Sequence, residues 1–130
     1  PMGQLNVKRG KEAELHAALR DIRSALDACK RAADEGRVEK PADASGYPPT
    51  LEILVQGMPD LRDPGKRTIR FLRRIPRDPM HPDPEASAVD TWGKRSYASD
   101  PDAPRAGADV YDIYSLSLET GLNGIAYREW

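Results

Sequence analysis

The chain has 130 residues, of which 38% are hydrophobic and only one Phe, five Tyr and two Trp are aromatic, so we expect one domain with a modest core. Its 20 basic and 21 acidic residues leave a net charge of −1, which gives no reason to expect nucleic-acid binding through bulk charge. The single cysteine, Cys29, excludes an intramolecular disulfide.

Residues 8–36 are predicted to form one long amphipathic helix. Its apolar residues recur at steps of three and four; they are Leu15, Ala18, Leu19, Ile22, Ala25, Leu26, Cys29 and Ala32. Residues 11–35 alone would span about 37 Å, more than a core of this size needs. Gly36 marks the end, whereas no capping residue directly precedes Lys11. We assign residues 1–7 to a cloning remnant and the start of the helix.

Residues 37–90 are predicted to connect this helix to a sheet, with two short helices on the way. Thr50 is expected to cap the first, which ends at Gly57. The second is expected over residues 67–74, before Pro76. Four prolines within residues 76–84 then predict an extended connector.

Residues 91–130 are predicted to hold the sheet and a C-terminal loop. Alternating polar and apolar residues indicate strands at 91–98 and 110–116, and a weaker strand is expected at 125–128. The expected fold is therefore α+β: a long N-terminal helix packed on a small three-stranded antiparallel sheet, with residues 8–130 as one domain.

No motif predicts catalysis. His16 and His81 belong to no metal-ligand spacing, and no serine lies in a nucleophile elbow. An arginine run at 67, 70, 73, 74 and 77 is better suited to ion pairing with protein than to nucleic acid, since the net charge is near zero. We predict that the protein is not an enzyme.

Five short blocks, in this order, resemble the soluble domain of a type II secretion pseudopilin, specifically the major (G-type) subunit. They are Ala25-Leu26-Asp27-Ala28-Cys29-Lys30, Gly46-Tyr47-Pro48-Pro49-Thr50, Phe71-Leu72-Arg73-Arg74-Ile75-Pro76-Arg77-Asp78-Pro79, Trp92-Gly93 with Tyr97, and Tyr111-Asp112-Ile113-Tyr114-Ser115. The resemblance covers residues 8–130.

The resemblance implies a type IV pilin-like fold and a structural role in protein transport. Members of this family carry a cleaved leader, are methylated, and are anchored in the inner membrane by an apolar helix that this sequence does not include. Their periplasmic domains polymerise with other pseudopilins and inner-membrane secretion components into a short filament. Two alternatives remain open: a type IV pilin or minor pseudopilin, and a periplasmic binding module for an unknown ligand.

The resemblance also implies a contact between subunits. An acid on the long helix pairs with an arginine of a neighbouring subunit in this family. The matching residues are Asp27 and Arg73 or Arg74. The alternative is a pair within the helix, between Asp27 and Arg23 or Arg31.

A calcium ion is the one cofactor that the resemblance suggests. The family binds it in the loop after the Tyr-Asp-x-Tyr-Ser strand, where this chain offers Ser117, Glu119 and Asn123. Calcium usually takes several carboxylates, and only Glu119 supplies one. The alternative is a loop shaped by Gly121 and Gly124 that closes by hydrogen bonds without metal.

Overall fold

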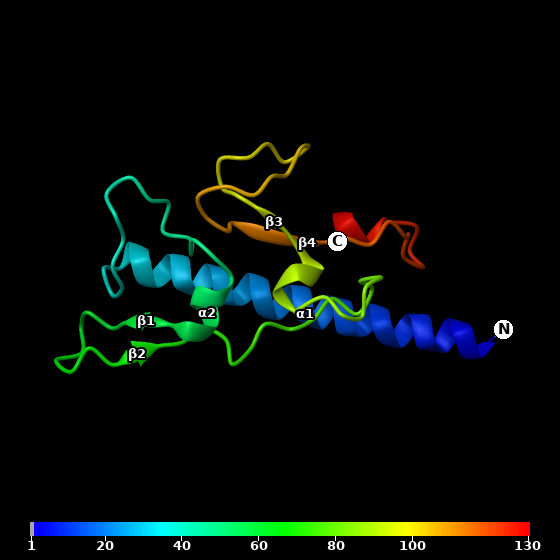
Figure 1. Ribbon diagram of the computed structural model, residues 1–130, viewed down its shortest axis with the longest axis horizontal. Coiled ribbons are helices and arrows are strands. Elements are labelled where there is room, and N and C mark those ends of the chain that lie inside the picture. The colour runs from blue at the N-terminus through cyan, green and yellow to red at the C-terminus, as the bar shows by residue number, and fades with distance from the viewer. Residues whose placement is uncertain (1) are drawn as a thin grey trace.

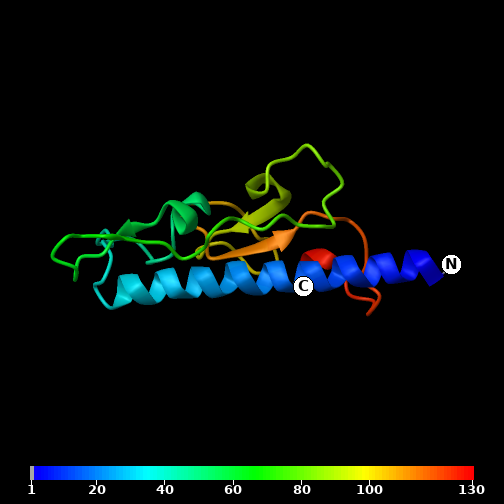
Figure 2. The ribbon, with the colours of Figure 1, turned by 90° about the horizontal axis from the view of Figure 1, so that it is seen from below.

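The computed structural model describes residues 2–130 and has one long helix with all other elements laid along it (Figures 1 and 2). The expected α+β class is confirmed, with the long helix at the N-terminus. The elements are α1 (Met2–Asp34), α2 (Glu52–Gln56), β1 (Met58–Pro59), β2 (Thr68–Ile69), the 3₁₀ turn η1 (Val89–Thr91), β3 (Trp92–Arg95), β4 (Asp112–Ser115) and the 3₁₀ turn η2 (Tyr127–Glu129).

The predicted long helix is confirmed and begins earlier than expected, at Met2 instead of residue 8. Its buried residues are those of the apolar stripe, from Leu15 onward, together with Ala33. Gly36 adopts a φ of +71°, a left-handed conformation that suits glycine and turns the chain out of the helix. The N–H of Arg37 then donates to the carbonyl of Ala32 at 2.9 Å.

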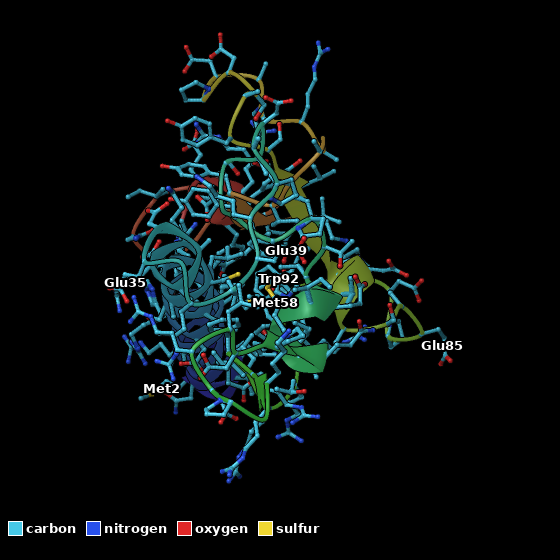
Figure 3. The ribbon with its side chains drawn as sticks, turned by 90° about the vertical axis from the view of Figure 1, so that its left-hand side faces the viewer. Met2, Glu35, Glu39, Met58, Glu85 and Trp92 are labelled. Carbon is cyan, nitrogen blue, oxygen red and sulfur yellow. The ribbon has the colours of Figure 1, made fainter. Side chains whose placement is uncertain are left out.

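The core forms where the stripe of α1 meets the connecting region and the C-terminal half. Trp92 lies near the middle of the molecule when it is viewed along α1 (Figure 3). The indole N–H of Trp92 donates to the Pro76 carbonyl at 2.8 Å, so this large side chain buries no unpaired polar atom. The other buried residues of the same core cluster are Leu15, Ala18, Leu19, Ile22, Ala25, Leu26, Cys29, Leu51, Leu54, Val110, Ile113 and Tyr127.

The first short helix is confirmed as α2, which ends at Gly57 as predicted. Its predicted cap is wrong, because the residue before α2 is Leu51 and no side chain caps the helix. Elsewhere in residues 37–90 the structure places the turn η1 but no second α-helix.

The helix predicted over residues 67–74 is wrong, because Thr68–Ile69 forms strand β2, which pairs antiparallel with β1. Both residues are β-branched, which favours a strand. The chain is then fixed by α2, since the N–H groups of Phe71 and Leu72 both donate to the Leu54 carbonyl. A carbonyl near the C-terminal end of α2 therefore accepts the two N–H groups that a helix over residues 67–74 would have to pair within itself.

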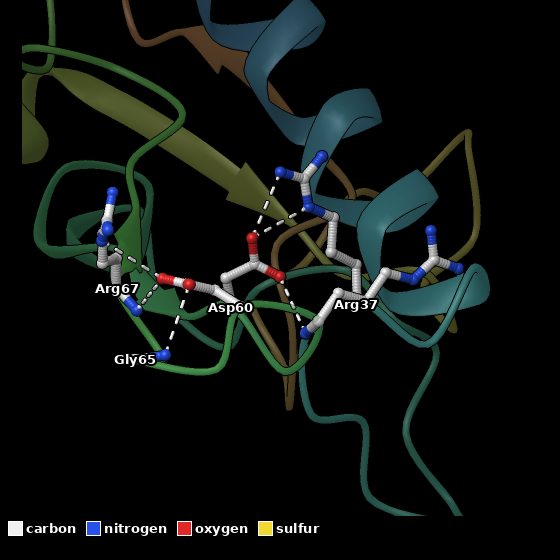
Figure 4. A network of polar contacts seen from close by, with 6 residues as sticks. Arg37, Asp60, Gly65 and Arg67 are labelled. Atoms are coloured by element: carbon white, nitrogen blue, oxygen red, sulfur yellow. Dashed lines mark hydrogen bonds and ion pairs between the residues drawn. The ribbon is translucent and has the colours of Figure 1, made fainter.

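The β1–β2 hairpin is fastened to the end of α1. The Arg37 guanidinium pairs with the Asp60 carboxylate at 3.2 Å (Figure 4). Within the turn, the Asp63 carboxylate accepts the N–H groups of Gly65 and Arg67. The hairpin therefore follows from contacts between residues distant in sequence as well as from local turn chemistry.

The two later strands pair antiparallel, with Trp92 opposite Ser115 and Arg95 opposite Asp112. Gly93 lies opposite Tyr114, and a Cβ on Gly93 would stand 2.2 Å from the Tyr114 ring. Glycine is therefore needed here because the aromatic ring covers the β3 backbone.

The predicted third strand at residues 125–128 is wrong: the structure has two two-stranded sheets, and Tyr127–Glu129 forms η2. The edge of β4 is already occupied. The Ile113 N–H donates to Asp112 Oδ1 at 2.8 Å, and the Ile113 carbonyl accepts from Arg23 at 3.2 Å. Side chains thus satisfy both backbone groups that a neighbouring strand would bind.

Candidate functional site

The residues predicted to join subunits are all on the surface. Asp27, Arg73 and Arg74 are exposed, and within residues 2–130 none of them has a salt bridge. The alternative pairing of Asp27 inside the helix is not found in this part of the chain. Asp27 and the two arginines are therefore accessible to a partner molecule.

Arg23, the alternative partner of Asp27, instead joins α1 to the C-terminal half. Its guanidinium forms a 2.9 Å ion pair with Asp112 and donates to the carbonyls of Ile113 and Trp130. All five guanidinium N–H donors lie in one plane, so a single arginine can bind several acceptors along a strand edge. This residue orients β4 on the helix.

A second polar contact fastens the C-terminal loop, which we define as residues 116–126, to the first half of α1. The Glu12 carboxylate accepts from the Leu122 N–H at 2.9 Å and from the Tyr127 hydroxyl at 2.6 Å. One turn earlier, the Lys8 ammonium donates to the Thr120 carbonyl at 3.1 Å. Charged groups at i and i+4 of one helix thus bind the backbone of the loop.

The next residue of this series, His16, stacks on Trp130, with ring centroids 4.2 Å apart. Trp130 also packs edge-on against Tyr127, and its indole N–H donates to the Ile125 carbonyl. Lys8, Glu12 and His16 lie at successive steps of four on one side of α1. We call these three residues the helix clasp.

The contacts around Glu12 set the charge states of Glu12 and Tyr127. Partial burial raises the pKa of Glu12, but hydrogen bonds from Tyr127 and Leu122, with the positive charge of Lys8, outweigh it and hold the pKa below its ordinary value of 4.5. Burial, together with the hydrogen bond to Glu12, raises the pKa of Tyr127. Glu12 is therefore an anion and Tyr127 a donor at neutral pH.

The residues predicted to bind calcium lie in or beside turns of the C-terminal loop. The Ser117 hydroxyl accepts the Glu119 N–H at 3.1 Å, and the Asn123 side chain accepts the Ile125 N–H at 3.0 Å. The loop is closed further by the Gly121 N–H, which donates to the Ile125 carbonyl at 2.8 Å. These residues supply a single carboxylate, a donor set that does not fit calcium, which needs six to eight oxygens.

Asp78 is a buried polar residue that the sequence motif contained but that we did not single out. Its carboxylate accepts from the Ser115 hydroxyl at 2.6 Å and from the Met80 N–H at 2.8 Å. The Asp78 N–H donates to the Thr91 hydroxyl at 3.1 Å. Asp78 therefore joins the proline-rich connector to β4. In the sequence, the prolines beside Asp78 were the one feature that could have indicated its structural role.

A cavity of about 870 Å³ opens near the C-terminal end of α1, between residues 38–49 and 96–109. We call it the loop cavity. Tyr47 and Tyr97 line it, with their ring centroids 6.1 Å apart. Cys29 also lines it but is only 1% exposed, and burial raises the pKa of its thiol to about 11, so it behaves as a small apolar residue.

Among residues 2–130 no group of three or more His, Cys, Asp or Glu side chains is placed to hold a metal ion. Over the same residues, no helix combines the length and the apolar character that crossing a membrane requires. No protein-family model matches this chain, and neither curated proteins nor solved structures gave a match.

Proposed function

We propose that this protein is a structural subunit of a type II secretion pseudopilus, a filament of the bacterial periplasm. The observation that carries the proposal is the form of α1. Residues 2–14 of this helix contain no buried residue, so about 20 Å of it lies outside the hydrophobic core. The C-terminal loop covers part of this stretch at Lys8 and Glu12, and residues 2–7 are exposed. A helix that is longer than the core on which it packs leaves an uncovered surface that neighbouring molecules can contact.

Two further features support the proposal. Two of the five resembling blocks supply contacts between the parts of the fold: Asp78 binds Ser115 of β4, and Trp92 belongs to the core cluster. Asp27 and the Arg73–Arg74 pair are exposed and have no salt bridge within the described residues. The domain would lie in the periplasm, attached to the inner membrane by an apolar helix outside this sequence.

Assembly of the full natural protein tests the proposal. Overproduced in a bacterium with a type II secretion system, it should form filaments visible by electron microscopy in the sheared fraction. Asp27→Arg should abolish them, because the substitution places like charges opposite each other at the subunit contact. Adding Arg73→Asp or Arg74→Asp should restore them.

Asp21→Arg is the matched control, since Asp21 is another exposed acid of α1 without a salt bridge in the described part of the chain. It should leave filaments intact. Absence of filaments from the unaltered protein would overturn the proposed function. Filaments that tolerate Asp27→Arg would overturn only the ion pair.

A further inference from the structure

The C-terminal loop contains an asparagine followed by a glycine, Asn123-Gly124, and both residues are exposed. In such a pair the backbone nitrogen of the glycine can attack the side-chain amide carbon of the asparagine, because glycine has no Cβ to obstruct the approach. A Cβ added to Gly124 would meet no atom within 4 Å, so its surroundings are open. The other asparagine, Asn6, precedes the β-branched Val7 inside α1, where the backbone is fixed. The two asparagines therefore differ in the features that govern this reaction.

The turn around Asn123 holds both reacting groups. The Asn123 side-chain oxygen accepts the Ile125 N–H at 3.0 Å, which draws electrons from the amide carbon and favours attack on it. The Gly124 N–H donates to the Gly121 carbonyl at 2.9 Å, and its hydrogen must be lost before the nitrogen reacts. The closed turn thus activates the carbon that is attacked but holds the attacking nitrogen. The reaction therefore requires the turn to open.

Opening of the C-terminal loop should require little free energy. Within residues 116–126 only one serine and one glycine are buried, so no large apolar side chain of the loop has to leave the core. The helix clasp opposes the opening, because Glu12 accepts the N–H of Leu122, the residue directly before Asn123, at 2.9 Å. The clasp therefore controls how often Asn123 and Gly124 are free to react.

We propose that Asn123 is a site of spontaneous deamidation, reached when the C-terminal loop opens from the helix clasp. Base removes the Gly124 N–H proton, a bond forms between this nitrogen and Asn123 Cγ, and the Cγ–Nδ2 bond breaks as ammonia leaves with a proton from water. Water then opens the cyclic imide. Cleavage of the N–Cγ bond gives aspartate, and cleavage of the backbone C–N bond gives isoaspartate, in which the chain runs through the side chain. The inference does not depend on the proposed filament function.

The isoaspartate product has one more methylene in the backbone of a turn that lacks room for it. A Cβ on Gly121 would already lie 2.6 Å from the Trp130 ring and 2.8 Å from Asn123 Oδ1. The Ile125 carbonyl closes the turn, since it accepts the Gly121 N–H at 2.8 Å and the Trp130 indole N–H at 3.1 Å. A longer backbone breaks these hydrogen bonds. Formation of isoaspartate therefore releases the loop from α1 irreversibly and adds a negative charge to it.

Mass spectrometry of aged protein tests the site. The folded wild-type chain is incubated at mildly alkaline pH and digested with trypsin, which yields residues 1–8 with Asn6 and residues 106–128 with Asn123. Peptide 106–128 should become heavier with time, as an NH₂ group is replaced by OH, while peptide 1–8 keeps its mass. An unaged sample, digested in the same way, corrects for deamidation during the digestion.

Glu12→Ala tests control by the clasp, and Glu14→Ala is the matched control, because Glu14 is exposed on the same helix. Glu12→Ala should raise the rate at Asn123 several-fold, toward that of the wild-type chain in urea, and Glu14→Ala should leave it unchanged. The inference is overturned if Asn123 is modified no faster than Asn6 in both the wild-type chain and Glu12→Ala. Equal rates in the two variants would also overturn it, because the clasp would then not control the opening.

Asn123→Asp separates the effect of the new charge from that of the added methylene. This variant carries the carboxylate on an unaltered backbone, and its side chain can still accept the Ile125 N–H. Amide exchange at Leu122 should therefore stay slow in Asn123→Asp and become fast in the isoaspartyl form purified from aged protein. Equal exchange in the two would show that the turn accommodates the methylene and would overturn the release of the loop.

Discussion

Asp78 shows how a single buried carboxylate joins two parts of the chain. It is fully buried, and its carboxylate accepts hydrogen bonds from the Ser115 hydroxyl of β4 and from the Met80 N–H. The sequence indicated only that prolines flank this aspartate. Its role follows from the packing of a strand 37 residues away.

We expect Asp78→Ala to lower the free energy of unfolding by about 1–3 kcal/mol, because it leaves buried donors without acceptors. Urea denaturation followed by circular dichroism measures this change. Asp90→Ala is the control, since Asp90 is exposed, and it should shift the free energy by less than about 0.5 kcal/mol. Equal effects of the two substitutions would remove the structural role assigned to Asp78.

At the scale of elements, α1 was predictable because its apolar period is local information. Leu15, Ile22 and Leu26 lie on the buried face that their spacing predicts. The sheet was less predictable. Whether residues 125–128 pair with β4 depends on Arg23, which is distant in sequence and occupies the edge of that strand. No periodicity encodes such a contact.

The C-terminal loop should depend on pH through Glu12. The folded-state pKa of Glu12 is lowered, so its contribution to loop stability is full above the ordinary pKa of 4.5 and is lost as pH falls through the lowered value. Amide hydrogen exchange at Leu122, corrected for the intrinsic effect of pH, should therefore accelerate in that acidic range. Glu12→Gln should exchange faster at neutral pH and lack this acid transition.

Glu14→Gln provides the control, because Glu14 is exposed on the same helix. It should retain both the protection at neutral pH and the acid transition. An unchanged exchange profile in Glu12→Gln would show that the remaining contacts of the loop hold it without the carboxylate.

For the whole molecule, the class of fold was predictable from the sequence but the exposure of the apolar residues of the C-terminal loop was not. The apolar residues of the C-terminal loop look, in sequence, like ordinary strand or core residues. Their exposure becomes evident only when the loop is placed on α1, and the loop cavity is formed by segments about 60 residues apart.

The melting temperature of the whole chain should be the same in millimolar Ca²⁺ and in EDTA. The reason is that hydrogen bonds donated by the Gly121 N–H and accepted by the side chains of Ser117 and Asn123 close the C-terminal loop, and Glu119 is the only carboxylate among the predicted ligands. Differential scanning calorimetry measures the effect, with Mg²⁺ as the control for ionic strength. A rise specific to Ca²⁺ would demonstrate binding to the folded state.

The helix clasp also has a mechanical consequence. Side chains fasten the rest of the molecule to α1 at three heights along its axis: Lys8, Glu12 and His16 near one end, Arg23 in the middle, and Arg37 just past the other end. A force applied along the helix is therefore shared among three attachments. The domain would travel with the helix as one body instead of sliding along it when the helix is pushed or pulled.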